Sequence, residues 1–297
     1  MKNYLVFDIG GTKLKYALIN KDGELLDFGS KETPTSSKKD LINEFKSIMS
    51  NVSLPISGIG ISVPGKVDSK SQRISYGGSL PFLNGLSFGE ELDLDIPIAV
   101  ENDAKAATIA DLNGGILKNQ DSGAVLVLGT AIGGGIVLDN HLLYGKNDQA
   151  GEVSFMSLGN FSNDSLVGFK GSAVSLINKI AKHYHYQDIN DGPAVFDLIE
   201  KGDIYAHGLF EEFCQTIAVL VHNIQTILDI DFFVIGGGIS QRKIVVDGIY
   251  EALKKLRSSN SLVEATLKEP KIVGSAYKNK ANLFGAFFKV RNMDLKF

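Results

Sequence analysis

One local pattern occurs twice in this chain and constrains the fold more than any other feature. An apolar strand over residues 4–9 leads through Gly10-Gly11-Thr12 into a second strand over residues 13–19. Residues 124–138 repeat the arrangement, with a turn at Gly129-Thr130 between two apolar runs. Apolar runs on either side of a glycine turn are typical of β-hairpins. The repetition predicts a duplicated α/β unit that binds a nucleotide between its halves.

The segments after each hairpin follow a matching order. A helix and a strand come next in both halves, and residues 276–290 form an amphipathic C-terminal helix. We expect two domains, residues 1–113 with residues 276–297 and residues 114–275. The other predicted elements are strands at 25–32, 56–63, 96–102 and 232–235 and helices at 38–51 and 210–229.

Composition excludes several classes of protein. The chain has 297 residues, 44% hydrophobic and 22% charged, with a formal net charge of −4, which describes a globular protein without bulk attraction to nucleic acid or anionic membrane. A single cysteine, Cys214, excludes an internal disulfide, and its place beside an apolar helical stripe predicts a core residue. His183 and His185 lack a third ligand nearby and are interpreted as non-metal residues. We expect a cytoplasmic protein with no signal peptide or membrane span.

The first glycine turn has the composition of a phosphate-binding loop. Gly10 and Gly11 permit backbone angles closed to other residues, so that N–H groups and the Thr12 hydroxyl can approach phosphate oxygens. Asp8 ends the preceding strand, where it is placed to hold Mg²⁺ through water. This motif alone is weak, because glycine hairpins are common.

Two polar clusters supply candidate substrate contacts. At Asn102-Asp103 a strand becomes an alanine-rich helix, so either residue is well placed as the helix N-cap. A carboxylate there could also accept a proton from a substrate hydroxyl. The two roles are compatible, because Asn102 can cap the helix while Asp103 accepts the proton. Glu152, which follows Gly151, is suited to hydrogen bonding with sugar hydroxyls. The alternative, that it is an ordinary glutamate of a turn with no binding role, is equally compatible with the sequence.

In order and spacing, these motifs resemble the ROK family of sugar kinases and repressors along almost the whole chain. Six motifs carry the resemblance: the turn at 8–13, Pro64-Gly65, Glu101-Asn102-Asp103-Ala104, the stretch from Gly129 to Gly135, Ala150-Gly151-Glu152 and Gly236-Gly237-Gly238.

The resemblance implies an actin-like ATPase fold, of the ribonuclease H-like type, and transfer of the γ-phosphoryl group of Mg-ATP to a sugar hydroxyl, usually on carbon 6. It makes Asp103 the general base, and it makes Asn102, Asp103, Glu152, Gly65 and Ser79 the sugar-binding residues. The first phosphate turn would comprise Asp8, Gly10, Gly11, Thr12 and Lys13. The second would comprise Gly129, Thr130, Gly133, Gly134 and Gly135, with Gly236, Gly237 and Gly238 lining the adenosine side.

The chain departs from the family pattern after Glu152. Phe155 stands where the family usually has a histidine, and residues 157–171 lack the three zinc-binding cysteines, so no zinc is expected. We expect packing by Phe155, Phe161 and Phe169 to hold this loop instead. Val167 aligns with a second sugar-binding glutamate of the family, and Ser79 with an asparagine.

These losses remove contacts near the anomeric hydroxyl, and the favoured substrate is therefore a β-glucoside such as cellobiose. N-acetylmannosamine or glucose is the alternative, and an inactive sugar sensor or a chaperone-like ATPase is the alternative of another class. DNA binding is not expected, since no helix-turn-helix precedes Asp8. Family members commonly form dimers, so a homodimer is expected.

Overall fold

The computed structural model describes residues 2–160 and 162–294, which divide into two compact units. Within the described residues, the first unit comprises the chain up to Lys118, the segment Leu142–Ala150 and the chain from Lys280 onward. The second unit comprises Asn119–His141 and Gly151–Asn279. The segment 142–150 thus lies with the first unit, although the sequence offers no reason to separate it from its neighbours.

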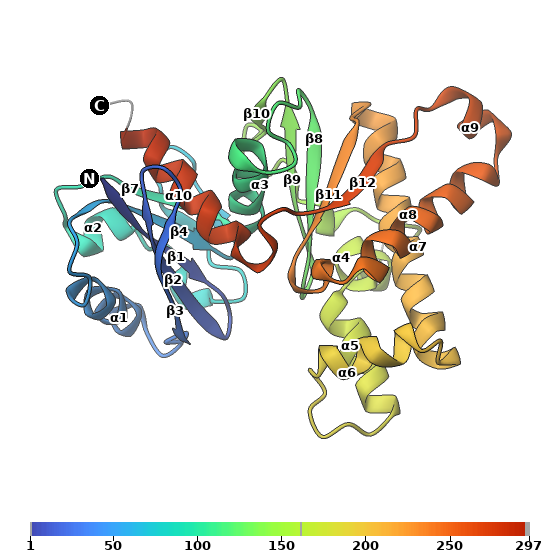
Figure 1. The fold of residues 1–297 in the computed structure, drawn as a ribbon, viewed down its shortest axis with the longest axis horizontal. Helices are drawn as coiled ribbons and strands as arrows, with labels where there is room; N and C mark the ends of the chain where they lie inside the picture. The colour runs from blue at the N-terminus through green and yellow to red at the C-terminus, as the bar shows by residue number, and fades with distance from the viewer. Residues whose placement is uncertain (1, 161, 295–297) are drawn as a thin grey trace. The chain divides into compact units, whose positions relative to one another are not determined.

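The first unit contains a mixed sheet in the order β3-β2-β1-β4-β7 (Figure 1). β1 runs antiparallel to β2 and parallel to β4, which runs parallel to β7. The strands are β1 (Asn3–Ile9), β2 (Lys13–Asn20), β3 (Leu25–Glu32), β4 (Ile56–Val63) and β7 (Ile98–Asn102), with a small ribbon of β5 (Lys66–Val67) and β6 (Ile74–Tyr76). The helices are α1 (Lys38–Ser50), α2 (Phe88–Leu92), α3 (Asp103–Gly114) and α10 (Ala281–Asp294).

Side-chain alternation along β1 divides this unit into two packed layers. Phe7 stacks on Phe45 of α1 with ring centroids 3.9 Å apart, and Phe45 stacks in turn on Phe88 of α2. On the opposite face, Tyr4 meets Phe287 of α10 edge to face. The odd-numbered residues of β1 therefore face α1, whereas Tyr4, Val6 and Asp8 face α10.

The second unit has a sheet of the same order, β10-β9-β8-β11-β12, which supports the predicted duplication. Its strands are β8 (Gly123–Leu128), β9 (Ile132–Leu138), β10 (His141–Leu142), β11 (Phe232–Gly236) and β12 (Lys271–Gly274). Its helices are α4 (Val167–Lys170), α5 (Ala173–His183), α6 (Gly192–Glu200), α7 (Ile204–Leu228), α8 (Lys243–Ser258) and α9 (Ser261–Thr266). Its core lies where α7 and α8 pack on the sheet.

Two helix boundaries differ from the prediction for local reasons. α7 begins six residues earlier than expected, because the Asp203 side chain caps it by accepting from the Ala206 backbone N–H at 2.9 Å. α10 begins at Ala281 rather than at residue 276, because Lys278 has a left-handed φ of 53° that interrupts a regular helix. Among the described helices, none is both long and apolar enough to cross a membrane.

Candidate active site

The junction of β7 and α3 fixes the two side chains that the sequence singles out there. Asn102 is the N-cap of α3, and its side-chain oxygen accepts from the Lys105 backbone N–H at 3.1 Å, which confirms the predicted cap. Its Nδ2 donates to the Gly65 carbonyl at 2.7 Å and to Oδ1 of Asp103 at 3.0 Å. The same Oδ1 accepts from the Ala104 N–H at 2.8 Å. Asn102 therefore ties the Asp103 carboxylate to the loop at Gly65.

Gly65 occupies a position that only glycine fits. Its φ is +85°, and a Cβ there would lie 2.1 Å from the Tyr76 carbonyl oxygen. The chain returns to Gly65 after β5 and β6, where a Cβ on Gly65 would lie 2.5 Å from the Gly78 backbone nitrogen. The next residue, Ser79, is exposed, and a Cβ built on Gly11 would lie 3.9 Å from its Oγ. The structure thus brings Gly65, Ser79 and the first glycine turn to one region of the first unit.

The first glycine turn is open and carries exposed donors. Gly10 donates its N–H to the Lys13 carbonyl at 3.0 Å, which closes the turn between β1 and β2. Gly11, Thr12 and Lys13 are exposed. Backbone amides, a hydroxyl and an ammonium group at an exposed turn are the donor set that binds phosphate.

Asp8 lies beside this turn as a buried carboxylate with defined partners. Its Oδ1 accepts from Ser62 Oγ at 3.2 Å and from Asn282 Nδ2 at 2.9 Å, while Oδ2 lies 3.4 Å from Lys15 Nζ. A Mg²⁺ ion held through water at Asp8, the role predicted from the sequence, would share this carboxylate with the Lys15 ammonium. Within the described residues, no three His, Cys, Asp or Glu side chains form a metal site, so such an ion would depend on phosphate oxygens for its other contacts.

The second glycine turn departs from the prediction in one respect. Gly129 and Thr130 do form the turn between β8 and β9, and the Gly129 carbonyl accepts the first N–H groups of α5. The glycines at 133, 134 and 135 were assigned to this turn but lie inside β9, paired with Val127, Leu126 and Val125. At Gly134 the absence of a side chain allows a close approach, because a Cβ there would lie 2.3 Å from the Gly151 carbonyl oxygen.

The third glycine cluster links β11 to α8. Gly236 ends the strand, Gly237 has a φ of +93°, and Gly238 begins a short 3₁₀ turn. A Cβ on Gly237 would lie 2.1 Å from the Leu128 carbonyl, so this glycine allows the loop to pack against the end of β8. Next in the chain, Arg242 lies over the Phe196 ring and pairs with Glu200 at 3.0 Å.

The loop after Glu152 is held differently from the expectation. Phe155 and Phe169 are 70% and 62% exposed, so packing by these rings does not hold it, and Phe161 lies outside the described residues. Val167 is instead fully buried, and its N–H donates to the Met156 carbonyl at 2.8 Å. Since Val167 is inaccessible, it cannot present a sugar-binding group where the family has glutamate.

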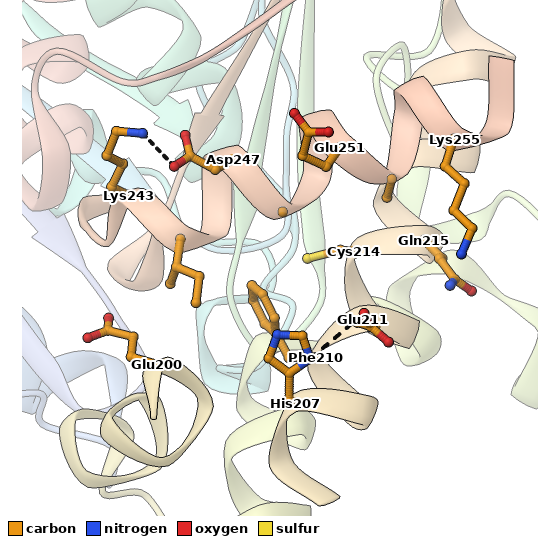
Figure 2. A pocket seen from close by; sticks show the side chains of 13 residues that line it. Glu200, His207, Phe210, Glu211, Cys214, Gln215, Lys243, Asp247, Glu251 and Lys255 are labelled. Atoms are coloured by element: carbon orange, nitrogen blue, oxygen red, sulfur yellow. Dashed lines mark hydrogen bonds and ion pairs between the residues drawn. The ribbon is translucent and has the colours of Figure 1, made fainter. Parts of the chain in front are cut away.

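A groove of about 650 Å³ separates parts of α7 and α8 in the second unit (Figure 2). Phe210 and Cys214 lie at its apolar part. Two pairs of lining side chains contact each other, Lys243 with Asp247 at 2.5 Å and His207 with Glu211 at 3.8 Å. Burial raises the pKa of the Cys214 thiol to about 12. Cys214 is therefore a packing residue, as predicted.

The comparisons with known proteins agree with this geometry. The ROK family model matches residues 4–292. An uncharacterized protein of Clostridium perfringens is 31% identical over 97% of both chains, and the β-glucoside kinase of Listeria monocytogenes is 26% identical over 95% of both. A ROK family protein from Streptococcus pneumoniae, solved in complex with sucrose, has a TM-score of 0.87 at 26% identity and covers 99% of this chain and 100% of its own.

The solved neighbours have the actin-like ATPase fold, which confirms the predicted fold class. Together with the family match over almost the entire length, the duplicated sheets and the glycine turns lead to one conclusion. The chain belongs to the ROK family.

Proposed function

We propose that the protein is an ATP-dependent sugar kinase that transfers the γ-phosphoryl group to a sugar hydroxyl, expected on carbon 6, with a β-glucoside such as cellobiose as the acceptor. The observation that carries the proposal is the Asp103 carboxylate, held at the start of α3 by Asn102 and Ala104 in the unit that also contains the first glycine turn. Phosphoryl transfer depends on positioning, charge stabilisation and a base that orients the nucleophile.

In this proposal Asp103 accepts the proton of the attacking hydroxyl, and the main role of Asn102 is to orient the Asp103 carboxylate. Both amide hydrogens of Asn102 are engaged, by Gly65 and Asp103, and its oxygen already accepts from Lys105. A sugar hydroxyl would therefore donate to the remaining lone pair of that oxygen. Glu152 supplies further sugar contacts from the second unit.

The nucleotide would be held by backbone groups. The amides at Gly11, Thr12 and Thr130 would donate to phosphate oxygens, with Lys13 adding charge and Asp8 orienting Mg²⁺ through water. The Gly10 and Gly129 N–H groups instead close their turns, on the carbonyls of Lys13 and Ala131. The loop of Gly236, Gly237 and Gly238 is proposed for the adenosine side. Mg²⁺, when bound, would neutralise charge that develops on the phosphate oxygens.

Phe155 supports a β-glucoside over free glucose. Its ring is largely exposed in the turn directly after Glu152 and offers an apolar face rather than a hydrogen-bond partner. In a β-glucoside the anomeric oxygen carries a second sugar or an aryl group. That group requires space and contact surface in the site more than it requires hydrogen-bond donors. N-acetylmannosamine and glucose remain the alternatives for the acceptor.

A panel assay tests this proposal. Sugar-dependent ADP release with Mg-ATP is measured for glucose, mannose, N-acetylglucosamine, N-acetylmannosamine, cellobiose and an aryl β-glucoside. The proposal predicts the strongest response to the last two. A stronger response to N-acetylmannosamine would transfer the assignment to an N-acetylated sugar, and sugar binding without ADP release would support a sensor.

Replacing Phe155 by Ala is expected to raise KM for the aryl β-glucoside about fivefold, the scale of a lost aromatic contact, and to leave KM for ATP unchanged. Steady-state kinetics on both substrates measures this. Phe28→Ala removes a partly exposed ring on β3 of the first unit and serves as the matched control. An unchanged KM for the glucoside in Phe155→Ala would remove the ring from the acceptor site.

A further inference from the structure

One face of α10 covers a row of polar side chains on the sheet of the first unit. Asp8, Ser62 and Glu101 are register partners across the parallel strands β1, β4 and β7, and such partners project to the same face. On α10, Asn282 donates to Asp8 at 2.9 Å and Lys289 donates to Glu101 at 2.6 Å. Seven residues are two helical turns, so both side chains lie on the same face of the helix.

Glycines seat α10 closely against its neighbours. A Cβ on Gly285 would lie 1.8 Å from the Ala106 carbonyl oxygen of α3, and a Cβ on Gly60 would lie 2.3 Å from the Ala286 carbonyl oxygen. Contact between backbones leaves little freedom for the helix to shift. The positions of Asn282 and Lys289 over the polar row are therefore set by packing as well as by their own hydrogen bonds.

Glu101 is the most buried charge in this row and is fully engaged. It is 2% exposed, and its Oε2 accepts from Lys289 Nζ and from the Tyr144 hydroxyl, both at 2.6 Å. Burial, together with the charge of Glu101, raises the pKa of Tyr144 well above its ordinary value, so this hydroxyl stays a donor. The other carboxylate oxygen, Oε1, accepts from the Asn102 backbone N–H at 2.9 Å.

These contacts form a chain that ends at the proposed base. Lys289 and Tyr144 hold Glu101, Glu101 holds the backbone of Asn102, and Asn102 holds Asp103. Tyr144 belongs to the segment Leu142–Ala150, which is also bound to α3, since Lys105 Nζ donates to the Asp148 carbonyl at 3.2 Å. Gly151 and Glu152 follow this segment directly.

We propose that Lys289 and Tyr144 are positioning residues of the kinase, which hold the Glu101 carboxylate so that Asn102 and Asp103 stand in the geometry needed for proton abstraction. This inference rests on the proposed function and deepens it. It also gives the segment 142–150 a role in holding the start of α3.

The test compares Lys289→Met and Tyr144→Phe with the wild-type protein by kcat and by KM for ATP and for the sugar. Without the Lys289 ammonium, Oε2 of the buried Glu101 loses its charged donor, so the carboxylate that accepts from the Asn102 backbone N–H is no longer held in place. We expect kcat of Lys289→Met to fall about tenfold, with KM for ATP unchanged.

Tyr144→Phe keeps the ring, should fold normally and is expected to shift kcat in the same direction by a smaller factor. Lys289→Arg should restore most of the activity, because it returns the charge. Lys2→Met is the matched control, since it breaks the Lys2–Asp294 ion pair at the last residue of α10 and leaves Glu101 untouched. Thermal melting of each variant measures stability separately from catalysis.

The outcomes separate the two claims. Absence of sugar-dependent turnover in the wild type would overturn the proposed function and the positioning role with it. Wild-type turnover that both variants retain would overturn the positioning role alone. So would a loss in Lys289→Met that is matched by a fall in melting temperature and is not restored by Lys289→Arg, because that pattern describes a structural defect.

Discussion

Asp103→Asn is expected to lower kcat by about 10²-fold or more and to leave sugar binding nearly unchanged, the usual scale for a lost general base. The asparagine oxygen can still accept from Ala104 and Asn102, as Oδ1 does now, so the start of α3 keeps its structure. The amide nitrogen that replaces the other oxygen donates hydrogen bonds and cannot take the hydroxyl proton. Single-turnover kinetics and sugar binding by calorimetry measure the two effects separately.

A matched control makes the same chemical change elsewhere. Asp139 is in the turn after β9 with a left-handed φ of 51°, which asparagine tolerates equally well, and Asp139→Asn should keep wild-type kcat. Near-normal kcat in Asp103→Asn would show that another group takes the proton.

Gly285→Ala is expected to destabilise the protein by about 3 kcal/mol, because the added methyl group would overlap the Ala106 carbonyl and push α10 away from α3. The same displacement would draw Lys289 and Asn282 away from Glu101 and Asp8, so activity should fall with stability. Chemical denaturation followed by circular dichroism gives the change in unfolding free energy.

Gly208→Ala provides the comparison on another helix. Gly208 lies inside α7, and a Cβ there meets nothing within 4 Å, so alanine should stabilise that helix by roughly 1 kcal/mol through its higher helix propensity. If the two glycine variants changed stability equally, close packing of α10 would not be the reason for glycine at 285.

Local sequence patterns predicted the strands, helices and caps that depend on only a few neighbouring residues. The strands of both hairpins, the α1 helix and the N-cap at Asn102 follow from apolar runs beside glycine turns, helical spacing and cap chemistry, which act over a few residues. The sequence places Gly133, Gly134 and Gly135 in a turn because glycine-rich stretches are typical of turns. In the structure they lie in β9, where Gly134 allows Gly151 to approach the strand. Periodicity alone does not reveal such a long-range contact.

In the candidate site, too, some residues can be predicted from the sequence and others are found only in the structure. Asp8, Asn102 and Asp103 carry motif signals and predicted roles. Glu101 belongs to a motif but has no predicted role, and neither Tyr144 nor Lys289 is predicted, because their contacts with Glu101 join segments more than 40 residues apart. A signal was present for two of them: Glu101 interrupts the apolar end of β7, and Lys289 follows Phe287 and Phe288 in α10. A charge within an apolar pattern predicts a buried partner, although not which one.

Stoichiometric coupling of ATP consumption to sugar is the most direct test of the central claim. ADP and sugar phosphate are quantified together for the wild-type protein with Mg-ATP, with and without cellobiose or an aryl β-glucoside. A sugar kinase predicts ADP release that requires the sugar and equals sugar phosphate mole for mole. ADP release at the same rate without sugar, and with no sugar phosphate formed, would contradict the account.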